Sequence, residues 1–416
     1  MLSSNQKKIL MFIGFISLII FLGFLLYLAF FKQMISTPIE DETTSTSTKM
    51  GILPIAEEGS GQNILKPKAK DSYSQDIIEN NTKKLIPNNI ARGGLTKTDE
   101  LNKSRSSAVI LSSDGKRIQY YNNDDGKFYY INSKGETTPL SDKVFHNVQK
   151  TTWSSNRNEA ILEYPDGSNI VYNFDTGKQV TLPKHWEDFD FSSNGNKIAM
   201  KSIGLDSNNR YLAIANSDGS MAKVIDKIGN NADKVYPSWS PNDQVVALFT
   251  EGIDFNRQEV FFIGQNNENF KSTVIEGRGF QPKWSPSGEK LLYSVYSSNN
   301  DMKPSLWLVN SQGEKIGSER KSLRIETWAD KCTFHGAGEV YCAVPNELEE
   351  GSGLFPELAK NTIDKLYKID IKTGAKKIVA IPEKDYNISN IIITDDGKFL
   401  YFTDEKTSRI HKINLK

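Results

Sequence analysis

The only two cysteines, Cys332 and Cys342, bracket the segment Thr-Phe-His-Gly-Ala-Gly-Glu-Val-Tyr. Such a pair could form a disulfide, remain as two buried thiols, or serve redox or metal chemistry. A β-hairpin centred on Ala337 would place the two cysteines directly opposite each other. Their Cα atoms would then be about 4.5–5.5 Å apart, a separation that a disulfide can bridge. The spacing therefore favours a disulfide and leaves the other two possibilities open.

Other residues that commonly carry chemistry are scattered along the chain. The four histidines are His146, His185, His335 and His411, and their spacing does not bring them together as metal ligands. The acidic residues lack the spacing of an EF-hand calcium loop. The Gly-x-Ser-x-Gly motif of the α/β-hydrolases is also absent from the sequence. We therefore expect no catalytic residues, no metal and no cofactor, and a protein that is not an enzyme.

The charges of the chain balance, with 51 Lys and Arg against 51 Asp and Glu among 416 residues. A general nucleic-acid-binding protein would need a basic excess or a basic stripe. The composition therefore predicts no nucleic acid among the partners.

An uncharged apolar run covers residues 9–31. As a helix it would be about 34 Å long, enough to cross a bilayer core of about 30 Å. The run is longer than the apolar part of a cleaved signal peptide, and no small-residue cleavage site follows it. Lys7 and Lys8 precede the run, which favours a cytoplasmic N-terminus. We therefore predict a cytoplasmic tail at 1–8, a single-pass transmembrane helix at 9–31, and an extracytoplasmic location for everything that follows.

Residues 32–83 have no sustained hydrophobic periodicity and contain the run Thr-Thr-Ser-Thr-Ser-Thr. This composition is typical of a flexible tether, so we predict a disordered linker here. About 50 residues of such a chain would have an r.m.s. reach of roughly 40 Å. The propeller domain described next is predicted to occupy residues 84–416.

A repeat of 38 to 59 residues begins after residue 100. Its copies are LSSDGKRIQY (Leu111–Tyr120), WSSNRNEAIL (Trp153–Leu162), FSSNGNKIAM (Phe191–Met200), WSPNDQVVAL (Trp239–Leu248), WSPSGEKLLY (Trp284–Tyr293), FHGAGEVYCA (Phe334–Ala343) and ITDDGKFLYF (Ile393–Phe402). Each copy has a large apolar residue, a turn rich in Ser, Pro, Asn, Asp and Gly, and a returning strand. Periods near this length are typical of propeller blades. The sequence thus predicts an all-β, seven-bladed β-propeller.

The last blade lacks a fourth strand, because the sequence stops after its third. An unpaired sheet edge favours aggregation, so another segment should supply the missing strand. We predict that residues 84–92, KLIPNNIAR, supply it and thereby close the ring.

The Trp-Ser-Pro segments at Trp239 and Trp284 resemble the repeats of TolB-type, WD-like β-propellers, and the copy at Phe334 departs most from that pattern. This resemblance covers residues 100–416 and implies the propeller fold, which hosts binding, scaffolding and catalysis alike. Similar repeats also occur in prolyl-oligopeptidase-type enzymes, whose catalytic elbow is absent here. Without the additional domain of TolB itself, a Tol–Pal role is not expected.

The connection between the second and third strands of blade six, Pro345–Asp364, is much longer than its counterparts. Long loops in compact domains are often functional, and such connections emerge on the face where propellers commonly bind partners. The candidate binding residues on this face are Glu347, Glu349, Glu350, Phe355, Glu357, Asp254, Phe255, Arg257, Asp206, Arg210, Asp301, Trp186 and Trp328.

The expected function is a non-catalytic protein-interaction scaffold of the cell envelope, attached to the membrane and binding a protein partner. The alternative is a module that binds glycan or another small ligand. A propeller hydrolase or lyase is the weaker alternative. A solvated loop that binds nothing would also fit the sequence.

Overall fold

The computed structural model describes residues 15–18, 20–23, 86–266, 268 and 270–416. The chain divides into two units, Met1–Glu79 and Asn80–Lys416. Residues 15–18 and 20–23 are helical. Within the described ranges no helix is long and apolar enough to cross a membrane. The predicted tail at 1–8, the predicted linker at 32–83 and most of the predicted span at 9–31 lie outside the described residues.

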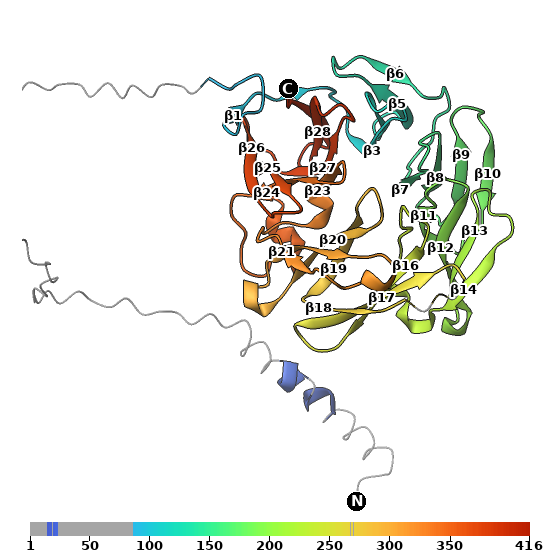
Figure 1. Cartoon of the computed structure of the whole chain (residues 1–416). Coiled ribbons are helices and arrows are strands. Elements are labelled where there is room, and N and C mark those ends of the chain that lie inside the picture. The colour runs from blue at the N-terminus through green and yellow to red at the C-terminus, as the bar shows by residue number, and fades with distance from the viewer. Residues whose placement is uncertain (1–14, 19, 24–85, 267, 269) are drawn as a thin grey trace, which may run out of the picture. The chain divides into compact units, whose positions relative to one another are not determined.

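The second unit is a seven-bladed β-propeller, as the repeat predicts (Figure 1). The first three blades are four-stranded antiparallel sheets. Blade one contains β3 (Ser106–Leu111), β4 (Ile118–Asn122), β5 (Lys127–Ile131) and β6 (Thr137–Pro139). Blade two contains β7 (Lys150–Trp153), β8 (Glu159–Glu163), β9 (Asn169–Asn173) and β10 (Gln179–Leu182). Blade three contains β11 (Trp186–Phe191), β12 (Lys197–Ile203), β13 (Arg210–Asn216) and β14 (Lys223–Lys227).

The remaining blades follow the same order. Blade four contains β15 (Val235–Pro237), β16 (Val245–Gly252), β17 (Arg257–Gly264) and β18 (Thr273–Glu276), and blade five contains β19 (Arg278–Trp284), β20 (Lys290–Tyr296), β21 (Pro304–Asn310) and β22 (Lys321–Ser322). Blade six contains β23 (Cys332–His335), β24 (Glu339–Pro345), β25 (Asp364–Asp370) and β26 (Lys376–Pro382), and blade seven contains β27 (Ile388–Ile393), β28 (Phe399–Asp404) and β29 (Arg409–Asn414). The connections contain the short 3-10 helices η1 (Ser207–Asn209), η2 (Gly229–Lys234), η3 (Ser298–Asn300), η4 (Gly313–Lys315), η5 (Ala329–Lys331) and η6 (Pro356–Ala359).

Two strands near the start of the propeller close the ring. β2 (Asp99–Glu100) pairs antiparallel with β29 and completes blade seven. β1 (Leu95–Thr96) pairs parallel with β26 of blade six. An N-terminal segment therefore closes the ring, but the prediction that residues 84–92 supply the strand is wrong.

Charge and backbone chemistry explain which segment pairs with β29. Asp99 Oδ2 lies 3.1 Å from Lys412 Nζ, and Glu100 Oε1 lies 3.3 Å from a guanidinium nitrogen of Arg409. In contrast, Pro87 has no N–H to give to a strand ladder, and Asn89 lies in a bend. Opposite charges across the strand pair thus favour β2 over the predicted segment.

In six blades a side-chain hydroxyl holds the turn between the first and second strands. The hydroxyl bonds the side chain two residues further on, as in Ser112–Asp114, Ser154–Asn156, Ser192–Asn194, Ser240–Asn242, Ser285–Ser287 and Thr394–Asp396. In blade four, Ser240 Oγ also accepts the amide hydrogen of Val245 at 2.9 Å. The Ser, Thr, Asn and Asp residues of the repeat therefore stabilise the turn through hydrogen bonds between neighbouring side chains and backbone groups.

The hairpin of blade six is one residue shorter. Trp284 faces Leu291 across blade five, and Phe191 faces Ile198 across blade three, whereas Phe334 faces Val340 in blade six. His335 occupies the position of the capping hydroxyl and pairs with Glu339 at the end of the strand. This difference explains why the copy at Phe334 fits the repeat least well.

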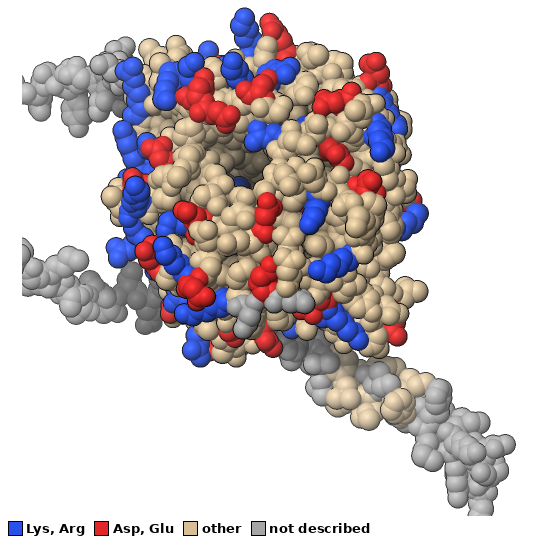
Figure 2. Space-filling view, turned by 45° about the vertical axis from the view of Figure 1, so that its right-hand side comes forward, with Lys and Arg blue, Asp and Glu red and all other residues tan. Residues whose placement is uncertain are grey.

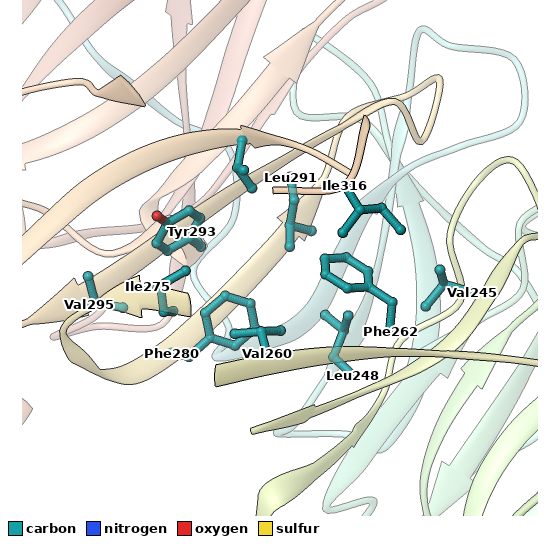
Figure 3. Close-up of a cluster of buried hydrophobic side chains, with 11 residues drawn as sticks. Val245, Leu248, Val260, Phe262, Ile275, Phe280, Leu291, Tyr293, Val295 and Ile316 are labelled. Carbon is teal, nitrogen blue, oxygen red and sulfur yellow. The ribbon is translucent and has the colours of Figure 1, made fainter. Parts of the chain in front are cut away.

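The core lies between neighbouring blades. Figure 3 shows such a cluster between blades four and five, where Val260 and Phe262 of β17 meet Leu291 and Tyr293 of β20. These four side chains are almost fully buried. Burial raises the pKa of the Tyr293 hydroxyl. Alternate residues of each strand pack against one or the other neighbouring blade, which accounts for the period of two in the repeat.

One face of the propeller is hollowed at its centre (Figure 2). Basic and acidic side chains are interspersed around the opening rather than separated into patches of one sign. This mixture agrees with the balanced composition of the chain.

Candidate functional site

Connections between the second and third strands of neighbouring blades are joined to each other. They are residues 253–256 of blade four, 297–303 of blade five and 346–363 of blade six. The Asn256 side-chain oxygen accepts hydrogen bonds from the amide and the hydroxyl of Ser298, at 3.0 and 2.9 Å. The amide of Gly351 donates to the carbonyl of Asp301 at 2.8 Å. The three connections therefore form one continuous surface, which we call the loop face.

Buried polar side chains hold the long connection of blade six in place. Lys331 Nζ lies 2.7 Å from Asp364 Oδ2 and donates to Asn387 Oδ1 at 2.8 Å. Asn387 Nδ2 in turn donates to the carbonyls of Ala359, at 2.9 Å, and Lys360, at 3.0 Å. Burial raises the pKa of the Asp364 carboxyl. The connection is thus fixed to blade seven at one end and to blade five at the other.

Large apolar side chains are exposed on the loop face. They are Phe255 (68% exposed), Phe355 (52%), Ile253 (46%), Leu354 (42%), Leu358 (40%) and Ile363 (36%). Phe255 was predicted from the sequence as a binding residue, and so was Phe355. Ile253, Leu354, Leu358 and Ile363 were missed, because exposure inside an irregular loop leaves no periodic signal. Exposed apolar groups gathered on one surface are typical of interaction sites.

Carboxylates surround these apolar tips. Asp254 lies 2.7 Å from Arg257 Nε, and the hydrogen bond from Arg257 lowers the pKa of the Asp254 carboxyl. Asp301 Oδ2 lies 3.7 Å from Lys303 Nζ. The other exposed carboxylates of the loop face are Glu347, Glu349, Glu350 and Glu357. Among the described residues these four form no ion pair, so this part of the loop face has an excess of negative charge.

Hollows adjoin the loop face. A hollow of about 540 Å³ lies between the connections of blades four and five, lined by Asp254, Phe255, Arg257 and Trp307 among others. Another, of about 500 Å³, lies against the blade-six connection and is lined by Glu347, Glu349, Leu358 and Ile363 among others. Predicted site residues therefore line both hollows.

Two predicted residues of blade three stabilise their own loop instead. The Asp206 side chain accepts the amide hydrogen of Asn208 at 2.8 Å and thereby caps η1. Arg210 Nε donates to the carbonyl of Gly204 at 3.1 Å. Among the residues that the structure describes, no hydrogen bond joins this loop to the connections of blades four to six.

Of the two predicted tryptophans, Trp328 lies in a blade-to-blade connection as expected, whereas Trp186 is part of a strand, and both residues are buried. Trp186 begins β11, and Trp328 directly precedes η5. Each of these two residues is only 7% exposed. Trp328 borders a hollow of about 430 Å³ together with Lys331, Glu357 and Glu405. The sequence gives only the approximate position of a tryptophan between two blades, whereas its burial depends on which neighbouring blade packs over it.

A polar cluster between blades two and three was not predicted. Lys150 Nζ lies 3.1 Å from Asp188 Oδ1 and 3.7 Å from Glu163 Oε1, and Lys201 Nζ lies 2.7 Å from Asp188 Oδ2. Burial raises the pKa of Glu163; burial also opposes ionisation of Asp188, but the hydrogen bond from Lys201 keeps that pKa low. The cluster has equal numbers of lysines and carboxylates. Because its members come from four different strands, their sequence spacing gives no signal.

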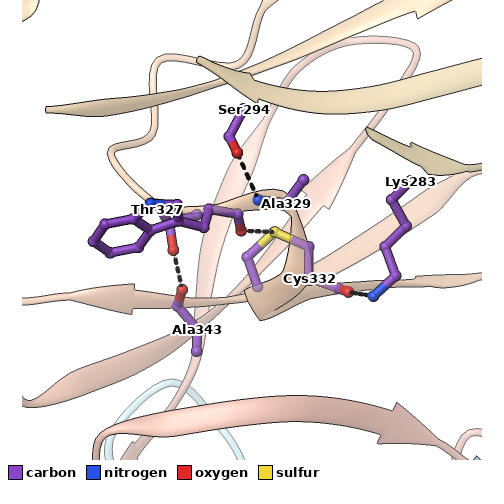
Figure 4. The surroundings of a disulfide bond; sticks show 8 residues. Lys283, Ser294, Thr327, Ala329, Cys332 and Ala343 are labelled. Atoms are coloured by element: carbon purple, nitrogen blue, oxygen red, sulfur yellow. Dashed lines mark hydrogen bonds between the residues drawn. A yellow bond between two sulfur atoms is a disulfide. The ribbon is translucent and has the colours of Figure 1, made fainter. Parts of the chain in front are cut away.

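The predicted disulfide between Cys332 and Cys342 is present, and the two residues face each other across β23 and β24 (Figure 4). Their Cα atoms are 4.0 Å apart, and both side chains are fully buried. The Thr327 hydroxyl donates to the carbonyl of Ala343 at 2.6 Å, and Lys283 donates to the carbonyl of Cys332. The disulfide thus lies in tightly packed surroundings that are held together by hydrogen bonds.

Within the described ranges, no group of three or more His, Cys, Asp or Glu is arranged to hold a metal ion. His411 on β29 is buried, and Tyr386 and Phe402 pack against its ring, with centroids at 4.6 and 5.2 Å. His335 on β23 packs near the ring of Tyr341. These histidines are part of the packing of their own blades.

Comparisons with known proteins identify the fold. No known family matches the sequence, and no curated protein matches it. The β-propeller domain of Cps50 (Swd1) from Myceliophteria thermophila superposes with a TM-score of 0.51 at 12% identity, over 77% of this chain and all of that one. A prolyl endopeptidase structure superposes with a TM-score of 0.51 at 11% identity, over 76% of this chain and 49% of that one.

The class of the protein follows from these observations. The chain contains a seven-bladed β-propeller similar in fold to the propellers of WD40 proteins and prolyl endopeptidases. At such low identity the likeness concerns the fold alone.

Proposed function

We propose that this protein is a non-catalytic scaffold of the cell envelope that binds a partner protein on the loop face. The observation that carries the proposal is the exposure of Phe255 and Phe355 on connections that hydrogen bonds fix to each other. Exposed aromatic side chains are frequent hot spots of protein interfaces. A preformed surface loses little conformational entropy when a partner binds.

The sequence supports attachment to a membrane. The apolar run at 9–31 would anchor the protein with its N-terminus in the cytoplasm, and residues 32–83 would let the propeller reach a partner. The disulfide fits an extracytoplasmic propeller, because oxidising compartments favour such bonds. The Trp-Ser-Pro segments at Trp239 and Trp284 favour TolB-type repeats within the propeller class.

The anchor and its orientation are tested together in intact cells. A membrane-impermeant, lysine-reactive reagent should label exposed propeller lysines such as Lys360, and alkaline carbonate should leave the protein in the membrane fraction. Deletion of residues 9–31 should release it. Unlabelled propeller lysines in intact cells would contradict the outward orientation.

Partner binding is tested by replacing the aromatic tips. The double variant Phe255→Ser with Phe355→Ser should lose most of the protein that copurifies from solubilised membranes, because hot-spot truncations cost about 2 kcal/mol or more each. Leu205→Ser is the matched control, since Leu205 is fully exposed on blade three, outside the loop face. Equal recovery of the partner with the double variant and the control would overturn the proposal.

A second candidate function is glycan or small-ligand binding. It is favoured by the hollow of about 540 Å³, which combines the aromatic side chains of Phe255 and Trp307 with the polar groups of Asp254 and Arg257. Aromatic faces and planar polar side chains together suit small polar ligands. Retention on cell-wall material, lost on Trp307→Ala, would favour this function over the scaffold.

A further inference from the structure

We propose that the segment bound on the loop face is a cationic polypeptide that also carries apolar side chains. This inference rests on the proposed function and specifies the chemistry of its partner. It is argued from the loop face alone, and in particular from the blade-six connection.

The apolar part of this surface is a compact ridge. The amides of Leu354 and Phe355 both donate to the carbonyl of Gly351, at 2.9 and 2.8 Å. A Cβ built on Gly351 would lie 3.9 Å from the Phe355 ring and 4.0 Å from Leu358. Phe355 and Leu358 therefore both pack beside Gly351, directly after Glu349 and Glu350 in the chain.

The charge around the ridge is uncompensated. Glu347, Glu349, Glu350 and Glu357 have no ion-pair partner among the described residues, and Lys360 is the one basic residue in this connection. Elsewhere on the loop face, the carboxylates of Asp254 and Asp301 already have cationic neighbours. A bound segment with lysine or arginine side chains would supply the missing positive charge.

The ridge is held in position before any partner binds. The Lys331–Asp364 pair and Asn387 fix its C-terminal end, and the bond from Gly351 to Asp301 fixes its N-terminal end. Because the surface is continuous through blade five to Phe255, a single bound segment can contact the tips of blades four and six together.

Other occupants fit this surface less well. A second copy of the chain bound through the same face would bring like charges together, which is unfavourable. An anionic lipid surface would be repelled by the same carboxylates. An uncharged glycan would leave the four glutamates without a compensating charge. The observations therefore favour a cationic, partly apolar polypeptide.

The test places the photo-cross-linking residue p-benzoylphenylalanine at Phe255 or Phe355 in the full chain within its native membranes. The same residue at Leu205 on blade three is the control. The expected result is one polypeptide captured from both loop-face positions and not from Leu205. The captured segment should contain more Lys and Arg than Asp and Glu, together with apolar residues.

The affinity of that purified polypeptide then tests the charge. The combined variant Glu347→Gln, Glu349→Gln and Glu350→Gln should bind it roughly fivefold to tenfold more weakly at low salt, from about 0.4 kcal/mol for each exposed charge pair. Lys360→Gln should bind more tightly. Rising salt should weaken binding to the wild type more than binding to the triple variant.

The outcomes separate this inference from the proposed function. Capture of one polypeptide whose segment is acidic or uncharged, or whose binding does not respond to salt, overturns the cationic partner and leaves the scaffold in place. Capture of lipid or of a second copy also overturns the cationic partner. Absence of any adduct at both loop-face positions overturns the scaffold itself.

Discussion

In six blades a serine or threonine side chain caps the first hairpin, whereas in blade six a disulfide joins the two strands. The capped blades contain a hydroxyl such as Ser240, which bonds Asn242 and the amide of Val245. In blade six the hairpin is one residue shorter, and His335 occupies the capping position. A bond between Cys332 and Cys342 holds its strands instead.

Blade six is thus stabilised by contacts that are not part of the repeat. Blade six lacks the local cap and also carries the longest connection of the loop face. It contains the disulfide and the buried Lys331–Asp364 pair, which together fix the connection above them. Reinforcement is therefore concentrated under the surface that we propose binds a partner.

The largest effect is expected from breaking the buried ion pair of blade six. Lys331→Met leaves Asp364 buried without its cation, which should lower the free energy of unfolding by about 3–5 kcal/mol. Urea unfolding followed by tryptophan fluorescence measures this change. The double variant Lys331→Met with Asp364→Leu should recover much of the loss, because no charge is left buried. Wild-type stability in the single variant would contradict this role of the pair.

Removal of the disulfide should have the next largest effect. The double variant Cys332→Ala with Cys342→Ala should lose roughly 3 kcal/mol, because the unfolded chain regains the freedom of the closed loop. Unfolding of the wild-type protein with and without reductant provides the control. If reduction left the unfolding midpoint unchanged, the disulfide would not be the element that replaces the missing cap.

A smaller effect is expected from removing a cap in a regular blade. Ser240→Ala leaves the buried amide of Val245 without its acceptor and should cost about 1 kcal/mol. His335→Ala, at the equivalent position of blade six, should change stability by less than about 0.5 kcal/mol. Thermal unfolding of both variants measures the two losses of stability. Equal losses would contradict the expected difference between the capped blades and blade six.

The smallest effect is expected from His411 on β29, the strand that pairs with β2 where the ring closes. Burial lowers the pKa of His411 below its usual 6.5, although Glu100 and Asp404 oppose this shift. Below about pH 6.5 the unfolded chain then binds more protons than the folded protein, so stability should fall as the pH is lowered from 7 to 5. His411→Phe should flatten this part of the curve. An unchanged slope would show that another group causes the pH dependence.

Much of the fold could be predicted because it is repeated. Anchors such as Trp239 and Trp284, each followed by a turn and an alternating strand, indicate the number of blades. The disulfide followed from symmetry, since Cys332 and Cys342 are equally far from the centre of one hairpin. Both inferences depend only on neighbours in the sequence.

The missed features depend on contacts between distant segments. β2 has two residues, too few to show a strand period, and its choice depends on Lys412 and Arg409. The joining of the loop face depends on backbone groups such as the amide of Gly351, which any residue except proline possesses. Such bonds leave no trace in residue type, so the sequence suggested individual candidate residues but did not show which of their connections are joined into one surface.

The closing strand also determines the order in which this fold can be completed. Asn102, just after β2, accepts the amide hydrogen of Ile410, 308 residues later in the chain. Since synthesis proceeds from the N-terminus, β2 leaves the ribosome long before its partner β29 exists. Contacts of such separation form slowly, and until then the edge of the seventh blade is open. The nascent propeller therefore stays an open arc of blades until β29 has been synthesised and can pair with β2.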